Sequence, residues 1–427
     1  MERLLHYVWK YKLYRATPLI TTGGSLVEVI DPGLQNTNAG PDFFNAKLKI
    51  DGTLWAGGVE IHQKASDWFV HRHHENKSYD AVILHVVGLA DTPVNRTNGE
   101  PIPQLVLPVP PEVARNIDWL LYRETAIPCV DYIRYIDSLH ISSWMEALLS
   151  ERLERKTQDI RNLLDQFEND WNEVFYITLT RSFGFGINND AFERLAKSLP
   201  FRYIRKQRGS HSQVEALLFG QAGMLEEKGN DPYYRLLQRE YLFLKHKFEL
   251  MPLDQTVFKS LRIRPLNFPY LKLAQLASLW FRYDSLFSAI LEAGSPGQIK
   301  QYFRIAPSDY WKTHYHFRTV SPEKEKPIGD GSLNILLINT VVPILFTYGL
   351  RGKRPEYCDR AMRLLESIPP ERNTIVSFFS QAGIQVSHAG DSQALIQLKR
   401  EYCEKKKCLH CRIGFRFLKQ QGILSGK

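Results

Sequence analysis

The sequence has no long hydrophobic run and little cysteine. No segment reaches the roughly 18 consecutive apolar residues of a membrane-spanning helix, and the first residues (MERLLHYVWKYK) lack the apolar core of a signal peptide. The chain has five cysteines in 427 residues, too few for the disulfide framework of a secreted protein. These absences predict a cytoplasmic protein with no membrane partner.

Two further absences narrow the class of protein. No repeat period is present, which argues against a solenoid. The glycine pair Gly184 and Gly186 is not a phosphate-binding loop, because no strand precedes it and no lysine follows it.

The 44% hydrophobic and 24% charged residues are typical of a folded protein, and 427 residues predict two or three domains. The net charge of +9 fits a polyanionic partner such as DNA or RNA.

Residues 1–125 contain the patterns of a small mixed sheet. Asp51-Gly52 is a strong hairpin signal, so Thr53–Gln63 should run antiparallel to Phe43–Ile50. The apolar run Ala81–Val87 is typical of a buried central strand. The other elements that we expect are a helix at 3–13, a strand at 25–30, a helical segment at 65–79 and an edge strand at 101–108. The order of the main elements is therefore αβββαβ.

Three polar side chains fall at the open end of the predicted hairpin. Asp42 begins the first arm, while Glu60 and His62 lie two residues apart near the end of the second and so share a face. The hairpin connection brings Asp42 beside Glu60. Adjacent carboxylates are the oxygen donors that Mg²⁺ or Mn²⁺ prefers, and such an ion can activate water for hydrolysis. We therefore expect Asp42 and Glu60 to be metal ligands.

Pro41-Asp42 and Glu60-Ile61-His62, placed on αβββαβ order, resemble the motif of the PD-(D/E)XK nuclease superfamily. The resemblance implies an α+β fold in which residues 1–125 form a divalent-metal-dependent phosphodiesterase that acts on DNA or RNA. His62 stands where the superfamily usually has a lysine. We expect His62 or Lys64 to position the attacking water or the scissile phosphate, with Lys47 on the paired arm as another source of positive charge.

Two other functions remain open. The missing lysine suggests a catalytically inactive scaffold that binds nucleic acid. The alternative is a zinc hydrolase that uses His62, His71, His73 and Asp42 on a small substrate, since imidazole is a common zinc ligand. His85, inside the apolar run, is expected to be a hydrogen-bonded core residue.

The chain as a whole also resembles an uncharacterised bacterial family that is defined by a domain of unknown function. The resembling stretches are GPDFFNAKLKIDGTLWAGGVEIHQKASDW, VILHVV, IRPLNFP and CLHCRIG. This resemblance covers most of the length and implies no particular activity.

Residues 126–400 have the periodicity of helices and are expected to form a mostly α-helical domain. The clearest helix is predicted at 138–167. A fully buried helix with a kink at Pro343 is predicted at 334–348.

Residues 401–427 form a basic tail that we expect to pack on the helical body. The tail contains Cys403, Cys408 and Cys411 in the pattern C-x4-C-x2-C. Thiolates suit Zn²⁺ or an iron–sulfur cluster, but three cysteines are one ligand short. Cys129 is the expected fourth ligand, and the alternatives are His410, Cys358 and His388. Some PD-(D/E)XK nucleases have a similar layout, in which one early and three late cysteines hold an iron–sulfur cluster.

Overall fold

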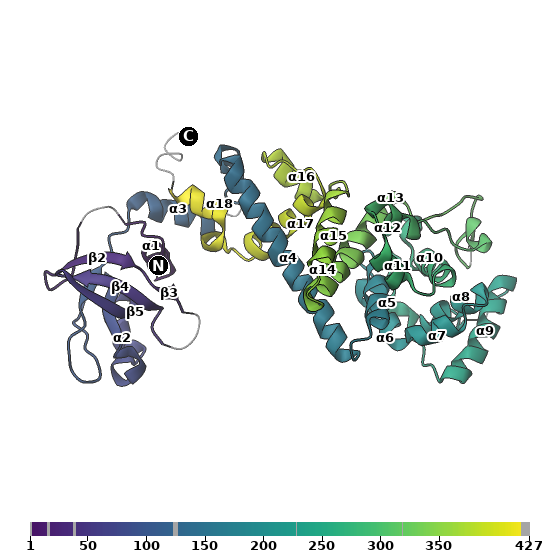
Figure 1. Cartoon of the computed structure of the whole chain (residues 1–427), viewed down its shortest axis with the longest axis horizontal. Coiled ribbons are helices and arrows are strands. Elements are labelled where there is room, and N and C mark those ends of the chain that lie inside the picture. The colour runs from purple at the N-terminus through teal and green to yellow at the C-terminus, as the bar shows by residue number, and fades with distance from the viewer. Residues whose placement is uncertain are drawn as a thin grey trace. The chain divides into compact units, whose positions relative to one another are not determined.

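Figure 1 shows the computed structural model of the chain, which describes residues 2–14, 18–36, 40–122, 127–227, 229–317 and 319–419. The chain divides into two compact units. Unit 1 contains residues 1–144, 381–384 and 398–427, and unit 2 contains residues 145–380 and 385–397. The boundary therefore lies within helix α4 (Ser138–Gln166) and not at residue 125, where we expected it. A regular helical pattern does not reveal that two units share one helix.

Unit 1 is built around a mixed sheet. The strand order is β1-β2-β4-β5-β6-β7, with β3 paired to β4. Neighbouring strands are antiparallel as far as β5, while β5, β6 and β7 run parallel to one another. The strands are β1 (Leu19–Ile20), β2 (Leu26–Asp31), β3 (Leu34–Gln35), β4 (Phe43–Ile50), β5 (Thr53–Lys64), β6 (Val82–Leu89) and β7 (Gln104–Val106). The prediction of a sheet-rich N-terminal part is confirmed.

The hairpin of β4 and β5 follows from its two turn residues. Asp51 and Gly52 both have positive φ angles, of 48° and 81°, which a two-residue type I′ turn requires. At the other end of β4, the register shifts between Phe43 and Ala46, and Asn45 there has a φ of 56°. Such a bulge bends a strand and re-aims the residues beside it, and here Asp42 is three residues before Asn45. The hairpin was predicted, whereas the bulge was not.

The two faces of the sheet have separate apolar cores. On one face, Val8 and Trp9 of helix α1 (Glu2–Lys10) pack with the odd-numbered residues Val59 and Ile61 of β5. On the opposite face, Trp68 packs with a small group of buried residues that includes Val82 and Val87 of β6. The six residues 82–87 of β6 are all buried, as expected for a central strand. The even-numbered residues of β5 therefore lie under the segment that contains Trp68.

The segment 65–79 is not the single helix that the sequence predicted. It forms the short helix α2 (Asp67–Val70) followed by two 3₁₀ turns, η1 (His73–Glu75) and η2 (Lys77–Tyr79). Arg72, with φ 57° and ψ 31°, is left-handed and interrupts the helix. Contacts between aromatic rings stabilise this segment, because His73 stacks on Tyr79 and lies edge-on to Trp68.

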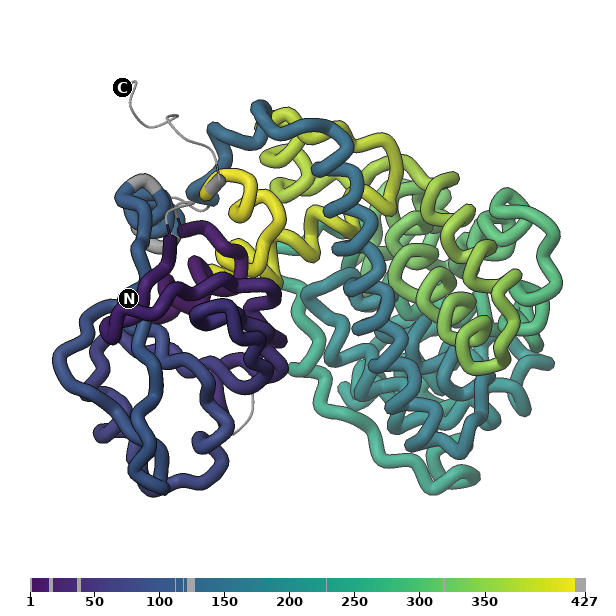
Figure 2. The backbone as a smooth tube through the Cα atoms, turned by 60° about the vertical axis from the view of Figure 1, so that its left-hand side comes forward, coloured from purple at the N-terminus to yellow at the C-terminus, as the bar shows by residue number. Residues whose placement is uncertain are grey.

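The C-terminal segment belongs to unit 1, where it packs against Tyr11 and against Tyr132 and Trp144, which lie in the first part of the region expected to form the helical body. Phe415 lies 4.9 Å from Tyr11 and Phe417 lies 5.3 Å from Tyr132, measured between ring centroids. Figure 2 shows this segment in yellow beside the purple N-terminal residues. The elements here are α3 (Pro111–Tyr122), η3 (Val130–Tyr135), the π-helical turn η8 (Leu398–Cys403), η9 (Cys408–His410) and α18 (Arg412–Lys419). Residues 420–427 lie outside the described part of the chain.

Unit 2 is helical, which confirms the prediction for the region after residue 144. Besides most of α4, it contains α5 (Trp171–Ser182), α6 (Asn189–Ser198), α7 (Phe201–Lys206), α8 (His211–Gln221), α9 (Pro232–Phe248), α10 (Pro269–Arg282), α11 (Leu286–Glu292), α12 (Pro296–Tyr302), α13 (Asp330–Leu336), α14 (Val342–Arg351), α15 (Pro355–Glu366), α16 (Thr374–Gln381) and α17 (Ala389–Gln397). A short hairpin is formed by β8 (His314–His316) and β9 (Thr319–Val320).

A π-helical turn, η7 (Leu337–Val341), joins α13 and α14 into one apolar helix just before Pro343. Among the described residues, this helix (Asp330–Arg351) is the one long and apolar enough to cross a membrane. Its most apolar window is 67% buried inside the structure, as in the core helix of a helical protein. The helix is therefore weak evidence for a membrane span.

Candidate metal centre

Strands β5 and β6 place three buried polar side chains next to one another. Glu60 and His62 lie on the same face of β5, and Glu60 is in register with His85 of the parallel strand β6. Glu60 is 4% exposed, His62 is 1% exposed and His85 is fully buried. Buried ionisable groups are rare unless a partner compensates for the loss of water, so this cluster needs one.

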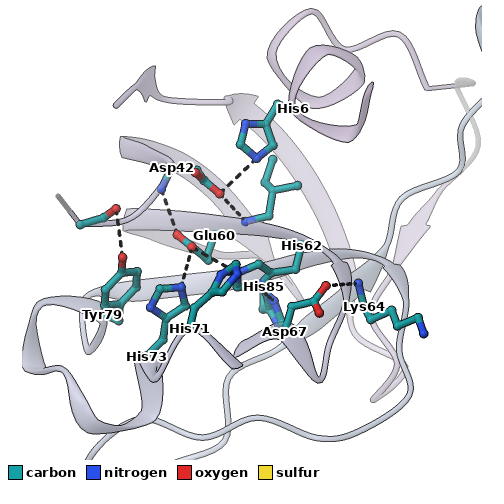
Figure 3. A network of polar contacts seen from close by, with 12 residues as sticks. His6, Asp42, Glu60, His62, Lys64, Asp67, His71, His73, Tyr79 and His85 are labelled. Atoms are coloured by element: carbon teal, nitrogen blue, oxygen red, sulfur yellow. Dashed lines mark hydrogen bonds and ion pairs between the residues drawn. The ribbon is translucent and has the colours of Figure 1, made fainter. Parts of the chain in front are cut away.

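The interrupted segment above this face supplies two more histidines. His71 and His73 flank the left-handed residue Arg72, and both reach the cluster (Figure 3). A left-handed conformation costs a residue other than glycine roughly 1–2 kcal/mol. Such strain is retained where the surrounding structure fixes it, often at functional sites. The turn at Arg72 brings together two imidazoles that a regular helix would point in different directions.

The donor atoms of these side chains converge on one small volume (Figure 3). His62 Nε2 lies 3.1 Å from His71 Nδ1 and 3.6 Å from Glu60 Oε1. His73 Nε2 lies 3.2 Å from the same oxygen of Glu60. The ligand nitrogens of His62, His71 and His73 all lie within 4.8 Å of one another. Four tetrahedral ligands at about 2.1 Å from a zinc ion would lie about 3.4 Å apart, so these spacings suit a single ion.

The tautomer of His62 decides which of its contacts are hydrogen bonds. Its Nδ1 lies 2.9 Å from His85 Nε2, and its Nε2 faces both Glu60 and His71. Burial, followed by the neighbouring histidines, lowers the pKa of His62 to about 3, so this ring is neutral near pH 7 and carries one proton. A proton on Nε2 would be donated to Glu60 or shared with a lone pair on His71 Nδ1. A lone pair on Nε2 would face the Glu60 carboxylate. A bound cation would satisfy both contacts, because each donor directs a lone pair at it.

The contact with His85 fixes the orientation of the His62 ring. Burial, followed by the charge of His73, lowers the pKa of His85 to about 4. Gln104 Nε2 donates a hydrogen bond to Thr92 O at 3.0 Å and lies 3.5 Å from His85 Nδ1. A histidine that binds a metal usually directs its other ring nitrogen to such a partner. His85 is thus a hydrogen-bonded core histidine, as the sequence predicted, and it also orients Nε2 of His62 toward Glu60.

Asp42 lies beside Glu60, but its carboxylate faces another group. The backbone N–H of Asp42 donates to Glu60 Oε2 at 3.0 Å, while Asp42 Oδ2 accepts a hydrogen bond from Ile61 N at 2.9 Å. The same oxygen lies 3.3 Å from His6 Nε2 of helix α1. Burial lowers the pKa of His6, but the hydrogen bond and charge of Asp42 outweigh that effect, so the pKa is raised overall. The expected proximity of Asp42 and Glu60 is present, and Asp42 is paired with a histidine.

The surroundings of Glu60 shift its pKa in opposite directions. Burial raises its pKa most strongly and the charge of Asp42 adds to this, whereas the hydrogen bond from His73 lowers it, and the net direction is upward. A cation among the histidines would favour the ionised form of Glu60. Tyr79, whose hydroxyl donates to Gly40 O at 3.4 Å, also has a raised pKa, because of its burial and of the two carboxylates.

The structure does not bring Lys64 or Lys47 into this cluster. Lys64 is exposed at the end of β5, its backbone N–H binds Asp67, and its side chain points away from Glu60 (Figure 3). Lys47 is exposed on β4, between the buried residues Ala46 and Leu48. Lys64 lies on the same face of β5 as Glu60, but it is the last residue of the strand, and its ammonium group is directed away from the site.

Sequence reasoning missed His6 altogether. Nothing in the helical pattern of residues 3–13 indicates that one histidine would meet Asp42 across the edge of the sheet. His71 and His73 were weighed only as ligands of an alternative zinc site. The signal that could have favoured them is the spacing His-x-His beside a residue that interrupts a helix, but Arg72 is not a residue type that marks such a break.

The sequence profile of one protein family matches residues 2–374, and its description is "Protein of unknown function (DUF2851)". The chain belongs to this family. The predicted membership of a family with a domain of unknown function is thus confirmed. The DUF2851 match includes the whole histidine cluster and Cys129, and it ends before Cys403. Searches of curated proteins and of solved structures found no match.

Proposed function

We propose that unit 1 is a metal-dependent phosphodiesterase that acts on nucleic acid, with an ion held by His62, His71, His73 and Glu60. The observation that carries this proposal is the convergence of three imidazole nitrogens and one carboxylate oxygen. The nitrogens of His62 and His71 lie 3.1 Å apart, and Glu60 Oε1 lies 3.6 Å from His62 Nε2 and 3.2 Å from His73 Nε2. His71 is exposed while the other three groups are buried, so water and substrate would approach from its side.

The donor set favours a borderline ion. Imidazole suits Zn²⁺ better than Mg²⁺, which prefers oxygen ligands and keeps several waters. From the sequence we expected Mg²⁺ or Mn²⁺ on Asp42 and Glu60, and the position of the histidines moves the proposed site to one side of Asp42. When bound, such an ion lowers the pKa of a water molecule and stabilises the charge that develops on a phosphate.

His6, held by Asp42, would supply from helix α1 the positive charge that the lysine supplies in the related motif. A raised pKa keeps His6 protonated to a higher pH than an ordinary histidine, and its side chain is 18% exposed. His6 would contact a phosphate oxygen, and Asp42 would hold both the His6 ring and, through its backbone N–H, the Glu60 carboxylate. Hydrogen bonds between a charged donor and a phosphate are among the stronger ones in proteins.

The class of substrate is supported by the sheet and by the net charge. The proposal is supported by the chain order of helix α1, strands β2, β4 and β5 and the parallel strand β6, although only the four-residue helix α2 and two 3₁₀ turns stand where the resemblance implies a second helix. Asp42 directly precedes β4, and Glu60 lies beside it within the adjacent strand β5. The net charge of +9 favours a polyanion over a small neutral substrate.

Cleavage of labelled DNA and RNA tests the proposal. Wild-type protein, stripped of metal and then supplied with Zn²⁺, Mn²⁺ or Mg²⁺ in turn, should cleave one of these substrates. Glu60→Gln and His73→Gln should each reduce the rate at least 100-fold, because both remove a donor from the buried cluster. His74→Gln is the matched control, since His74 is the neighbouring histidine and pairs with Glu75 outside the cluster.

Two results would contradict the proposal in different ways. Salt-sensitive binding of nucleic acid without cleavage under any ion would favour the inactive scaffold. Hydrolysis of small esters or amides that depends on His73, with no cleavage of nucleic acid, would favour the zinc hydrolase. Equal cleavage rates of wild type and Glu60→Gln would show that the proposed metal site is not the catalytic site.

A further inference from the structure

Four of the five cysteines gather in unit 1, away from the histidine cluster. Cys129 and Cys408 pack in the same apolar core, and the backbone N–H of Cys411 donates to Cys408 O at 3.2 Å. Cys403 ends the π-helical turn η8, which contacts η9 that begins at Cys408. Cys408 and Cys411 are buried, and all five cysteines are free thiols in the structure.

The four thiols influence one another in every pairing. Burial raises the pKa of Cys129, and the thiols of Cys411, Cys403 and Cys408 raise it further. Burial raises the pKa of Cys403 to about 12, again with contributions from Cys411 and Cys408. Burial likewise raises the pKa of Cys411 to about 11, and Cys408 contributes to it. Because each thiol acts electrostatically on the other three, the four sulfur atoms lie near one another, and a bound cation would displace their protons.

Polar groups already point at these sulfur atoms. The indole N–H of Trp144, a residue that is 4% exposed, makes no hydrogen bond in the structure. It lies close enough to Cys411 to lower the pKa of that thiol, as do the backbone N–H groups of Ile413 and Gly414 at the start of α18. A buried N–H without a partner costs roughly 1–3 kcal/mol, which a sulfur anion beside it would recover.

The other candidate ligands are placed elsewhere. Cys358 is in unit 2, where its thiol donates to Phe346 O at 3.6 Å. His388 is also in unit 2, paired with Asp391. His410 lies on η9, but the groups that influence its ring are Lys10, Lys407 and Arg3, which makes it a surface residue of a basic patch. Cys129 is therefore the fourth member of the set that the pattern C-x4-C-x2-C left incomplete.

We propose that Cys129, Cys403, Cys408 and Cys411 hold a thiolate-bound metal centre, either an iron–sulfur cluster or a zinc ion, that ties the C-terminal segment to unit 1. The proposal does not depend on the phosphodiesterase activity, because none of these residues belongs to the histidine cluster. Cys129 and Cys403 are separated by 274 positions (403 − 129). A link between such distant residues restricts the unfolded chain strongly, as a long-loop disulfide does.

The spacing of the sulfur atoms favours the cluster over the single ion. Around one zinc ion with Zn–S bonds of about 2.3 Å, tetrahedral sulfur atoms lie about 3.8 Å apart. Among the described residues, the ligand atoms of three histidines lie within 4.8 Å of one another, whereas no three of these sulfur atoms are that close. A cluster of several irons spans a wider cage than one ion, so it would need less movement of the four thiols.

Metal and sulfide analysis of protein purified without oxygen tests the proposal. We expect iron and sulfide at a constant ratio to protein, with brown colour and visible absorption, and Cys129→Ser should lose most of both. One zinc per chain that is lost in Cys129→Ser would also support the thiolate centre and identify its metal. Cys358→Ser, the matched control, should keep the full content. His73→Gln should keep it too, which separates this site from the histidine cluster.

Alkylation of the unmodified protein provides a test that no folding defect can obscure. In the metal-loaded protein, the four cysteines should resist iodoacetamide. Removal of the metal should free Cys129 and Cys403, which are partly exposed, while Cys358 reacts as before. The proposal is overturned if the purified chain retains neither metal. It is also overturned if Cys129→Ser keeps the wild-type content, or if Cys129 and Cys403 react equally with and without metal.

Discussion

The buried histidines make a specific prediction about acid stability. In metal-free protein, β5 and β6 should lose stability as the pH falls below the ordinary histidine pKa of 6.5. The unfolded chain binds a proton on His62 at that pH, whereas the folded chain does so only near pH 3, and His85 behaves in the same way near pH 4. Stability is therefore full above pH 6.5 and is lost as the pH falls.

The size of the loss follows from these values. At pH 5, the difference between a pKa of 6.5 and one of about 3 corresponds to about 2 kcal/mol for His62. A pKa of about 4 gives about 2 kcal/mol for His85, so the two together contribute about 4 kcal/mol. This is an upper value because the two rings are in contact. It is still a large part of the stability of a typical domain.

Hydrogen exchange of peptides from β5 and β6 measures this loss locally, once it is corrected for the intrinsic exchange rate at each pH. Wild-type protein in chelator should lose about 4 kcal/mol of protection between pH 7.5 and pH 5. The double variant His62→Gln, His85→Gln should be less stable at pH 7.5 but should show a much flatter dependence on pH. If the variant and the wild type lose protection in parallel, the two histidines are not buried in the neutral form and the reasoning fails.

Three further results are expected. Glu215 is fully buried and its pKa is raised to about 7. The folded protein therefore loses stability as the pH rises from 4.5 to 7, because the unfolded chain releases this proton more easily. Glu215→Gln should therefore stabilise unit 2 by up to about 3 kcal/mol at pH 8 and by little at pH 4.5 in urea unfolding, and a loss at both values would contradict this. A Cβ on Gly57 would meet Ile83 Cγ2 at 2.5 Å and Ala81 O at 2.7 Å, so Gly57→Ala should lower the stability of unit 1 by about 1–3 kcal/mol, while Gly23→Ala should change it little. His85→Gln should weaken Zn²⁺ binding about 10-fold or more in competition with a chelator, because His85 orients His62, and unchanged affinity would rule out that role.

Much of unit 1 could be predicted because local chemistry decides it. Asp51-Gly52 is one of the few residue pairs that adopt two positive φ angles cheaply, so the hairpin and its register followed from the sequence. The apolar run of β6 indicated a strand buried on both faces. From these two facts, the proximity of Asp42 and Glu60 could be predicted before any coordinates were known.

The rest depended on long-range packing. Arg72 adopts a left-handed conformation that no residue pattern requires, and that single residue decides where His71 and His73 point. His6 meets Asp42 because helix α1 packs on the sheet, and the cysteine tail joins unit 1 because aromatic rings of both ends meet there. Periodicity indicates which face of an element is apolar but not which partner covers it.

A crystal of the protein soaked with Zn²⁺, with diffraction data collected at the zinc absorption edge, tests the central claim most directly. We predict an anomalous peak within about 2.3 Å of His62 Nε2, His73 Nε2 and Glu60 Oε1, with His71 Nδ1 as a further ligand. A fully occupied peak elsewhere, with the histidine cluster unchanged and empty, would contradict the account.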